Sequence, residues 1–290
     1  MQLLLFVLSI PFIYFFSILP YPILRLLGDL IYFILYRIMR YRIAVVRKNI
    51  AHSFPEADTV TLRRYEKAFY RTFSDVIIET IKTFTYSKKF LLKHCQFENM
   101  SLIEKYMVQD RNILLVLGHY GNWEWGGAAF SLAAGEDTLA AYKPLRNPYF
   151  DKLMHHSRSR FGLHLIPKRK LIHFLASNKN RPLKLILISD QSPNPKEHYW
   201  VQFLHQDTAV VTGMEKIARQ YDYVVIYASI DKVKRGQYNV TFDLLSDNAK
   251  ELEPVALTRM FMQKLEESIR RDPGPYLWSH RRWKLRKPAS

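Results

Sequence analysis

The sequence predicts an α/β fold: a central, mostly parallel mixed sheet flanked by helices, with a membrane-associated helix at the N-terminus. Short apolar runs such as 112–117 and 183–189 have the length of buried strands. Longer stretches with helical periodicity, such as 59–84 and 253–271, lie before and after them. The first 24 residues carry no charged side chain. A helix-covered sheet that is attached to a membrane accounts for these three observations.

Residues 1–24 are predicted to be a membrane anchor. As a helix, 3–24 would span about 33 Å, close to the thickness of a bilayer's hydrocarbon core. The segment lacks a basic start and a small-residue cleavage site, so a removable signal peptide is the weaker interpretation. Pro11, Pro20 and Pro22 each remove a helical hydrogen bond, which leaves open a kinked or shallow helix in the interface.

The chain is strongly basic, with a formal net charge of +17, and such a field attracts an anionic membrane, an acidic carrier protein or a nucleic acid. Its 48% hydrophobic and 14% aromatic content is typical of a protein that works at a membrane surface. Residues 25–57 are predicted to be a basic, amphipathic interfacial segment. Because these cations follow the anchor directly, we expect the remaining body on the cytoplasmic face of the cell inner membrane.

Residues 58–290 are expected to form the catalytic α/β domain. It begins with a helix over 59–84, for which Asp58 is the candidate N-cap. Asp75 and Glu79 share one face of this helix, and either packing or function accounts for them. Further strands are expected at 138–142, 223–230 and 238–244, with a helix at 213–221.

His119 is the main candidate for catalysis. It follows the strand 112–117 across a glycine turn, and Asn122 is a plausible N-cap for a helix whose first turn contains Glu124. A His with an acid five residues later arises about once by chance at this composition, so the strand–turn–helix context carries the hypothesis. The turn lets His119 and Glu124 meet, and a carboxylate that accepts from one imidazole nitrogen leaves the other free as a base.

Downstream, Asn147 and Pro148 read as the N-cap and first residue of a helix that carries Arg158 and Arg160. A guanidinium grips phosphate in a bidentate way, although a solvated helix end explains these arginines equally well. The tail from 275 to 287 combines tryptophans with basic residues, which is the pattern of a headgroup anchor or of a segment packed on the core. The single cysteine, Cys95, excludes an internal disulfide.

The segment Gly118-His119-Tyr120-Gly121-Asn122-Trp123-Glu124 resembles the His-x4-acid signature of the lysophospholipid acyltransferase superfamily, in the form seen in the lipid A biosynthesis (lauroyl/myristoyl) acyltransferases. The resemblance covers nearly the whole chain, since further blocks recur in the same order. They are 42–49, Ser53-Phe54-Pro55, Tyr142-Lys143-Pro144 with Asn147, Arg158-x-Arg160-Phe161-Gly162, Asp190-Gln191 and 278–284. One departure is Phe203-Leu204-His205, where His205 stands in place of the glycine usual in the family.

The resemblance implies a membrane-bound O-acyltransferase that moves a fatty acyl chain from an acyl-carrier-protein or coenzyme A thioester to a hydroxyl of a lipid acceptor, first of all a lipid A precursor. His119 would act as general base and Glu124 would orient it, with no metal and no cofactor besides the thioester co-substrate. We expect a monomer. Helix N-terminal amides around 121–123 are suited to the oxyanion. The expected substrate-binding residues are Asn122, Lys143, Asn147, Arg158, Arg160, Asp190 and Gln191.

Two alternatives stay open at the level of sequence. A glycerolipid, an amino lipid or a glycolipid would need the same base and the same anchor as a lipid A precursor. A non-catalytic, membrane-tethered protein that binds anionic lipid or nucleic acid would explain the charge but not the strand, turn, His119 and Glu124 together. Nucleic acid is therefore not an expected partner. A metal-dependent hydrolase is disfavoured because the sequence has no His-x-x-x-His spacing.

Overall fold

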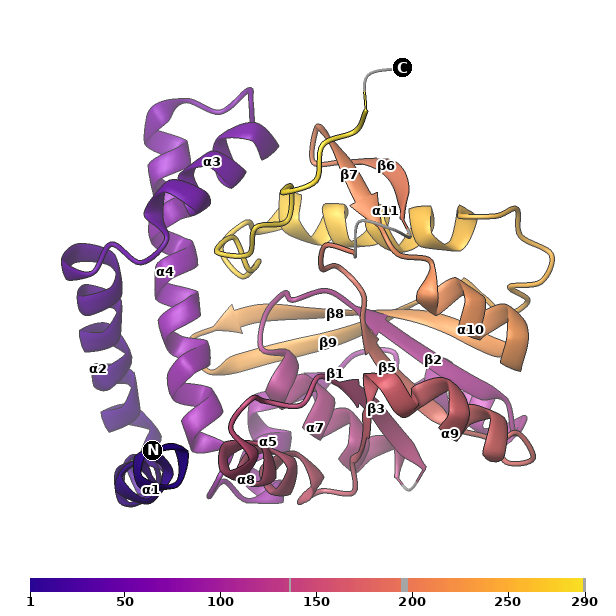
Figure 1. Ribbon diagram of the computed structural model, residues 1–290, viewed down its shortest axis with the longest axis horizontal. Helices are drawn as coiled ribbons and strands as arrows, with labels where there is room; N and C mark the ends of the chain where they lie inside the picture. Colours follow the sequence, from indigo (N-terminus) through magenta and orange to yellow (C-terminus); the bar gives the residue numbers. More distant parts are fainter. Residues whose placement is uncertain (136, 194–197, 289–290) are drawn as a thin grey trace.

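The computed structural model describes residues 1–135, 137–193 and 198–288, and it confirms a central sheet flanked by helices (Figure 1). Within these ranges, a seven-stranded sheet has the order β1-β9-β8-β2-β5-β3-β4, and its neighbouring strands are parallel except in the β8–β9 hairpin. A second hairpin pairs β6 with β7. The strands are β1 (Cys95–Phe97), β2 (Asn112–Leu117), β3 (Thr138–Tyr142), β4 (His164–Pro167), β5 (Lys184–Ile188), β6 (Tyr199–Phe203), β7 (Gln206–Val210), β8 (Tyr223–Lys234) and β9 (Gln237–Ser246).

The sheet has a hydrophobic layer on each face, because side chains alternate along a strand. In β2, Ile113, Leu115 and Leu117 belong to one core cluster, and Leu114 and Val116 belong to the other. The helices of the first layer are α5 (Lys88–His94), α6 (Ser101–Val108) and α7 (Trp123–Ala134). Those of the second layer are α9 (Leu171–Ser177), α10 (Gly213–Tyr221) and α11 (Ala256–Arg271). A strand buried on both faces reads as a continuous apolar run, which is why β2 was predictable.

The N-terminal helices lie together at one side of the sheet, along the long helix α4 (Figure 1). Asp58 accepts a hydrogen bond from the Thr61 amide at 2.7 Å, which confirms the predicted N-cap of α4. A π-helical turn, η1, continues α2 and interrupts the regular helix before α3. The bounds are α1 (Gln2–Ile18), α2 (Tyr21–Tyr32), η1 (Phe33–Ile38), α3 (Ile43–Ser53), α4 (Thr59–Lys82) and, near α1, α8 (Pro148–Ser159).

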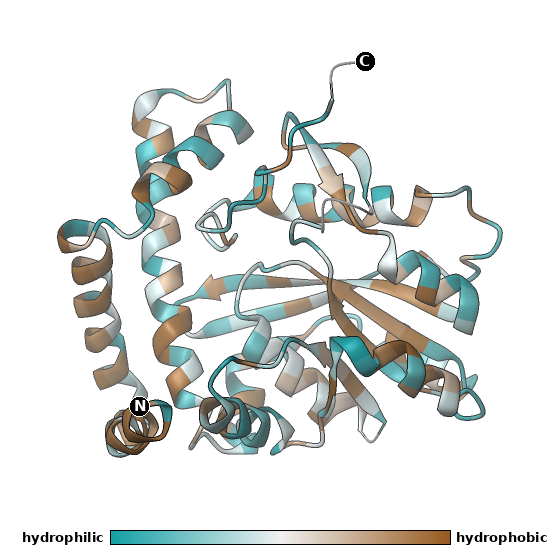
Figure 2. Cartoon of the chain, in the orientation of Figure 1, coloured by the Kyte–Doolittle hydropathy of each residue, from teal (hydrophilic) through white to brown (hydrophobic). Residues whose placement is uncertain are grey.

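Residues 3–24 do not form the one continuous helix that would be needed to span a bilayer. The chain turns at Leu19 and Pro20, so α1 ends at Ile18 and α2 begins as a separate helix at Tyr21. Proline lacks the amide that would continue the helical ladder at that point. In the described part of the chain, no helix is both long enough and apolar enough to cross a membrane. Figure 2 shows α1 and α2 as strongly hydrophobic helices, and many of their apolar side chains are exposed.

Most predicted elements agree with the structure to within a few residues, including 112–117, 138–142 and the helix 213–221. The short pieces β1, β4, β6 and β7 were not predicted. The predicted boundaries between anchor, interfacial segment and catalytic domain, at residues 24 and 57, stay predictions. Helix α2 runs through position 24 without a break.

The turn that departs from the family pattern closes the β6–β7 hairpin with Leu204 and His205, whose φ angles of 50° and 60° are left-handed. Residues other than glycine pay about 1–2 kcal/mol for this conformation. Burial of the Leu204 side chain and a 2.7 Å hydrogen bond from its amide to Glu266 offset this cost.

Candidate active site

His119 and Asp190 meet because their strands are neighbours in the sheet. Strands β2 and β5 are parallel, and their register pairs Leu117 with Ile188. Each site residue lies two positions beyond its paired residue, at the carboxyl edge of the sheet where open α/β folds bind ligands. The His119 ring Nδ1 lies 2.6 Å from Asp190 Oδ1, and the His119 backbone amide donates to Oδ2 at 3.1 Å. The carboxylate therefore holds both the ring and the backbone of His119.

The hydrogen bonds assign the tautomer of His119. Since Asp190 can only accept when ionised, Nδ1 carries the proton and Nε2 keeps a lone pair. The side-chain amide of Gln191 lies 3.2 Å from Nε2 and donates to it. Gln191 is exposed, whereas the Asp190 side chain is only 4% exposed. The reactive nitrogen thus contacts an exposed side chain, and a substrate hydroxyl could take the place of the Gln191 amide.

Burial and charge shift the pKa values of His119 and Asp190 in opposite directions. Burial lowers the pKa of His119, but the Asp190 charge and hydrogen bond, helped by the more weakly acting charge of Glu124, leave that pKa above its ordinary 6.5. Burial raises the pKa of Asp190, but the interactions with His119 and the charge of Arg282 outweigh it and leave this pKa lowered. Asp190 therefore stays ionised while His119 gains and loses a proton.

Glu124 does not make the hydrogen bond to His119 that the sequence led us to expect. Its two oxygens accept from Arg158, with Nε at 2.8 Å and Nη2 at 2.5 Å. Arg158 lies on α8, which packs near the first turn of α7, and its planar fork matches both carboxylate oxygens. The carboxylate that contacts the His119 ring is thus that of Asp190. Glu124 still contributes its charge to His119.

The turn between β2 and α7 is tightly constrained. Gly121 has φ +67°, and a Cβ at this position would lie 2.0 Å from the carbonyl oxygen of Ile230. The Gly121 amide donates to the carbonyl of Pro275 at 3.2 Å, so it is not free to bind an oxyanion as we expected. The amides of Trp123 and Glu124 open α7 and have no partner within the helix. They are the better donors for a developing negative charge.

Residues 272–283, which we call the C-terminal strap, hold the other side of this turn. The Leu277 amide donates to the His119 carbonyl at 3.1 Å. Asn49 of α3 donates to the carbonyl of Trp278 at 2.8 Å. Figure 1 shows the strap, in yellow, between α4 and α11. Trp278 is fully buried, so of the two interpretations of the tail, packing on the core is correct for this residue. The sequence showed the basic aromatic cluster but not its contact with His119.

Three of the expected substrate-binding residues use their polar groups inside the protein. Asn122 is fully buried and caps α7, with Oδ1 accepting from the Trp125 amide at 3.0 Å. Asn147 caps α8, as its sequence predicted, by accepting from the Tyr149 amide at 3.0 Å. Arg160 donates to the carbonyls of Thr83 and Tyr86, just after α4, so the solvated-end interpretation is wrong for it.

The remaining expected residues lie around the His119 side of the sheet. Lys143 follows β3 and is exposed. Arg158, Asp190 and Gln191 contact Glu124 or His119 directly. The structure therefore brings five of the nine residues that the sequence selected into direct contacts. His119, Asp190 and Gln191 meet beyond the carboxyl ends of β2 and β5, and Arg158 of α8 meets Glu124 at the start of α7.

Comparison with known proteins identifies the family of the chain. The family model described as bacterial lipid A biosynthesis acyltransferase matches residues 2–285. The chain is similar to the lipid A biosynthesis lauroyltransferase of Escherichia coli K12, with 24% identity over 270 residues that cover 92% of this chain and 87% of that protein. It is 22% identical to the lipid A biosynthesis palmitoleoyltransferase of the same strain over 275 residues, covering 92% and 87%. A lipid A biosynthesis acyltransferase of Haemophilus influenzae is 24% identical over 273 residues, covering 92% and 86%.

Proposed function

Because this chain belongs to the bacterial lipid A biosynthesis acyltransferases and is therefore an acyltransferase, we propose that it transfers a fatty acyl chain from a thioester to a hydroxyl of a lipid A precursor, with His119 as the general base. The observation that carries this proposal is the bond between His119 Nδ1 and Asp190, which leaves the lone pair of Nε2 available at the carboxyl edge of the sheet. The donor is an acyl-carrier-protein or coenzyme A thioester.

The reaction needs a base because a hydroxyl is a weak nucleophile at neutral pH. As the acceptor oxygen attacks the thioester carbonyl, His119 Nε2 takes its proton, and Asp190 stabilises the imidazolium. The tetrahedral intermediate collapses to the ester, the carbon–sulfur bond breaks, and the imidazolium returns the proton to the departing thiolate. General base catalysis of this kind contributes about 10² to 10⁴ in rate. The nucleophile belongs to the substrate, so the protein needs no catalytic serine or cysteine.

Glu124 and Arg158 support the same chemistry through the charge near His119. The charge of Glu124 favours the protonated form of His119, and Arg158 fixes where that charge lies. The free amides of Trp123 and Glu124 would bind the oxyanion at the start of α7. The exposed cations Lys143 and Arg146 would meet phosphates of the acceptor or an acidic carrier.

We also propose that α1 and α2 lie in the interface of an anionic membrane on its cytoplasmic face, without spanning it. Leu4, Leu8 and Phe12 of α1 and Leu26 and Leu30 of α2 are among the exposed apolar side chains. Helices with an exposed apolar face bind in the plane of the interface. Exposed basic side chains follow directly in η1 and α3, where anionic headgroups would attract them.

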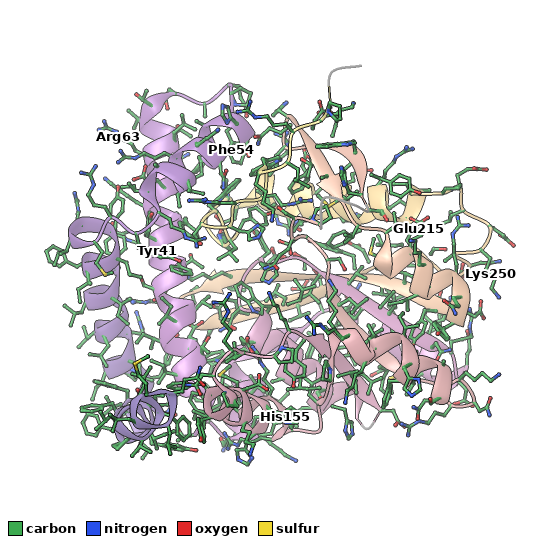
Figure 3. The ribbon with its side chains drawn as sticks, in the orientation of Figure 1. Tyr41, Phe54, Arg63, His155, Glu215 and Lys250 are labelled. Carbon is green, nitrogen blue, oxygen red and sulfur yellow. The ribbon has the colours of Figure 1, made fainter. Side chains whose placement is uncertain are left out.

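The test is a transfer assay with purified full-length protein. A lipid A precursor is offered together with acyl carrier protein or coenzyme A thioesters of several chain lengths, and the products are identified by mass spectrometry. We expect the mass of one acyl chain to be added with one donor class, and His119→Ala to reduce this at least 10²-fold. His155→Ala is the control, because His155 is an exposed histidine on α8 (Figure 3).

Each possible result of this assay has a separate meaning. Vesicle binding is measured on the same variants. If His119→Ala still binds vesicles but has lost transfer, the protein is an enzyme whose membrane contact does not depend on its base. Unchanged transfer in His119→Ala would remove the base from the mechanism. Glycerolipid, amino lipid and glycolipid acceptors are offered in parallel, and a product on one of these alone would reassign the acceptor.

A further inference from the structure

Glu79 is a fully buried carboxylate whose hydrogen bonds come from three distant parts of the chain. The Tyr21 hydroxyl donates to Oε1 at 2.6 Å. The Asn122 amide and the Tyr238 hydroxyl both donate to Oε2, at 2.7 and 2.6 Å. An ionised carboxylate has lone pairs for all three donors, and these donors partly compensate its burial. Burial raises the pKa of Glu79, and the hydrogen bonds from Tyr21 and Tyr238 act against this rise without cancelling it. The three bonds exist only while the start of α2, the start of α7 and β9 are all in place around α4.

The Asn122 contact reaches the candidate active site. Asn122 lies three residues after His119 and two before Glu124. Its Oδ1 accepts from the Trp125 amide, so its Nδ2 is the atom that points to Glu79. The Trp125 indole also donates to the backbone carbonyl of Glu79, at 3.0 Å. A movement of Glu79 would therefore disturb the cap of α7 and the segment that carries both catalytic candidates.

The Tyr21 contact reaches the helices with exposed apolar faces. Tyr21 is the first residue of α2, directly after the corner at Pro20. The turn of the β8–β9 hairpin closes over its ring, because a Cβ at Gly236 would lie 2.0 Å from the Tyr21 hydroxyl oxygen. When α2 is packed against α4, the β8–β9 turn therefore restricts the Tyr21 hydroxyl to one position, and there it donates to Glu79.

Two further contacts hold the same corner without reaching the active site. Lys82 of α4 donates to the carbonyl of Ser17 at the end of α1, at 2.8 Å. Arg235, next to the β8–β9 turn, donates to the carbonyl of Arg25 in α2, at 2.7 Å. The corner between α1 and α2 can therefore stay attached when the bond between Tyr21 and Glu79 is removed. This makes the bond testable by itself.

We propose that Glu79 is a positioning residue that couples the seating of α1 and α2 on a lipid surface to the geometry of the segment from His119 to Glu124. Lipid contact with the exposed faces of the two helices keeps their corner packed against α4. The Tyr21 hydroxyl then holds the Glu79 side chain in position, and Glu79 in turn holds Asn122, the N-cap of α7. The active site is then best ordered where a lipid acceptor lies. This coupling rests on the membrane contact that the proposed function assigns to α1 and α2.

Hydrogen exchange of the full-length protein tests the coupling without any substrate. Amide exchange over residues 119–126 is measured with and without vesicles of equal parts phosphatidylethanolamine and phosphatidylglycerol. In the wild type we expect vesicles to slow this exchange. In Tyr21→Phe the same amides should exchange about fivefold faster on vesicles than in the wild type, as loss of one hydrogen bond predicts. This readout stays valid even if the acceptor in the proposed function is wrong.

Tyr227→Phe is the matched control, since Tyr227 is a buried tyrosine whose hydroxyl also has a side-chain partner, Ser268 of α11 at 2.9 Å. It should keep the wild-type response to vesicles. In the transfer assay, Tyr21→Phe should lower kcat about tenfold with KM unchanged, because a displaced base affects the chemical step. Gly236→Ala, which crowds the Tyr21 hydroxyl from the other side, should act in the same direction.

Some results would overturn the coupling. Vesicles that leave exchange over 119–126 unchanged in the wild type would show that the helices do not act on the site. Equal exchange and equal kcat in Tyr21→Phe and Tyr227→Phe would reduce Glu79 to a structural residue. Bound vesicles with a normal response in Tyr21→Phe would likewise assign the coupling to another contact of the corner.

Discussion

Two buried carboxylates, Asp190 and Glu215, differ in the groups that they bind. Glu215 of α10 accepts from the Val255 amide at 2.8 Å and from the Thr258 amide and hydroxyl at 3.2 and 3.0 Å (Figure 3). It satisfies the first turn of α11, where amides have no partner within the helix. Asp190 instead holds an imidazole whose other nitrogen faces an exposed glutamine.

The difference distinguishes a carboxylate that stabilises the start of a helix from one that, in the proposed mechanism, prepares His119 for reaction. The donors to Glu215 are backbone amides and a hydroxyl, none of which carries a charge. The ring that Asp190 binds is titratable, and the carboxylate sets its tautomer and raises its pKa. Both carboxylates are buried, so burial does not distinguish them. They differ because the partner of Asp190 is a titratable imidazole.

The largest effect that we expect comes from Asp190→Asn. The Asn oxygen can accept from the His119 backbone amide or from the ring, but not from both, and its NH2 group would favour the wrong tautomer. By analogy with other His–Asp pairs, kcat should fall by about 10³ to 10⁴. A thermal melt should show a folded protein. An Asn variant with near wild-type kcat would contradict the role of Asp190.

The same variant makes a prediction for pH dependence. In the wild type only neutral His119 is a base, so transfer should rise with pH through a pKa above 6.5. Without the Asp190 charge, burial lowers this pKa, and the acidic limb of the profile should move to lower pH. The profile of residual kcat/KM against pH measures the shift. A limb that stays in place would assign it to a group other than His119.

Glu215→Ala should show the opposite pattern. Removal of the carboxylate leaves buried donors at the start of α11 without a partner, which should cost about 2–4 kcal/mol of unfolding free energy. Denaturant unfolding measures this loss. At a temperature where the variant is folded, kcat should remain within about twofold of the wild type. A large loss of kcat in the folded variant would remove the distinction between the two carboxylates.

Arg158→Lys should give a smaller effect. Lysine keeps the positive charge near Glu124 but cannot make both hydrogen bonds of the guanidinium. The Glu124 carboxylate would then be less fixed beside His119, and kcat/KM should fall about tenfold. Arg181→Lys is a suitable control, because Arg181 forms an exposed ion pair with Asp137. Equal kinetics in the two variants would show that the geometry of Glu124 is unimportant.

The smallest effect is expected at the β6–β7 turn, which contacts neither carboxylate. His205→Gly should raise the unfolding free energy by about 1 kcal/mol, since glycine adopts the observed φ of 60° without strain. Denaturant unfolding measures the change, and transfer should be unaffected. A decrease in stability would show that the 3.0 Å contact between His205 and Arg270 outweighs the strain.

Sequence patterns alone identified the long strands, the helix caps and His119, because these features depend on residues that are close in the chain. The run 112–117 is apolar throughout since both faces of β2 are buried, and Asp58, Asn122 and Asn147 each cap a helix within three residues. The family resemblance rests on the same local blocks. These are the parts of the fold that could be read before any coordinates.

Tertiary structure decided which acid meets His119. Glu124 is five residues away in sequence but turns toward Arg158, whereas Asp190 is 71 residues away and forms the bond. The reason is the strand order: β5 lies beside β2 although β3 and β4 come between them in the chain, and a sequence does not encode that adjacency locally. The corner at Pro20, the strap over His119 and the three donors around Glu79 are likewise long-range contacts, so only the folded chain brings them together.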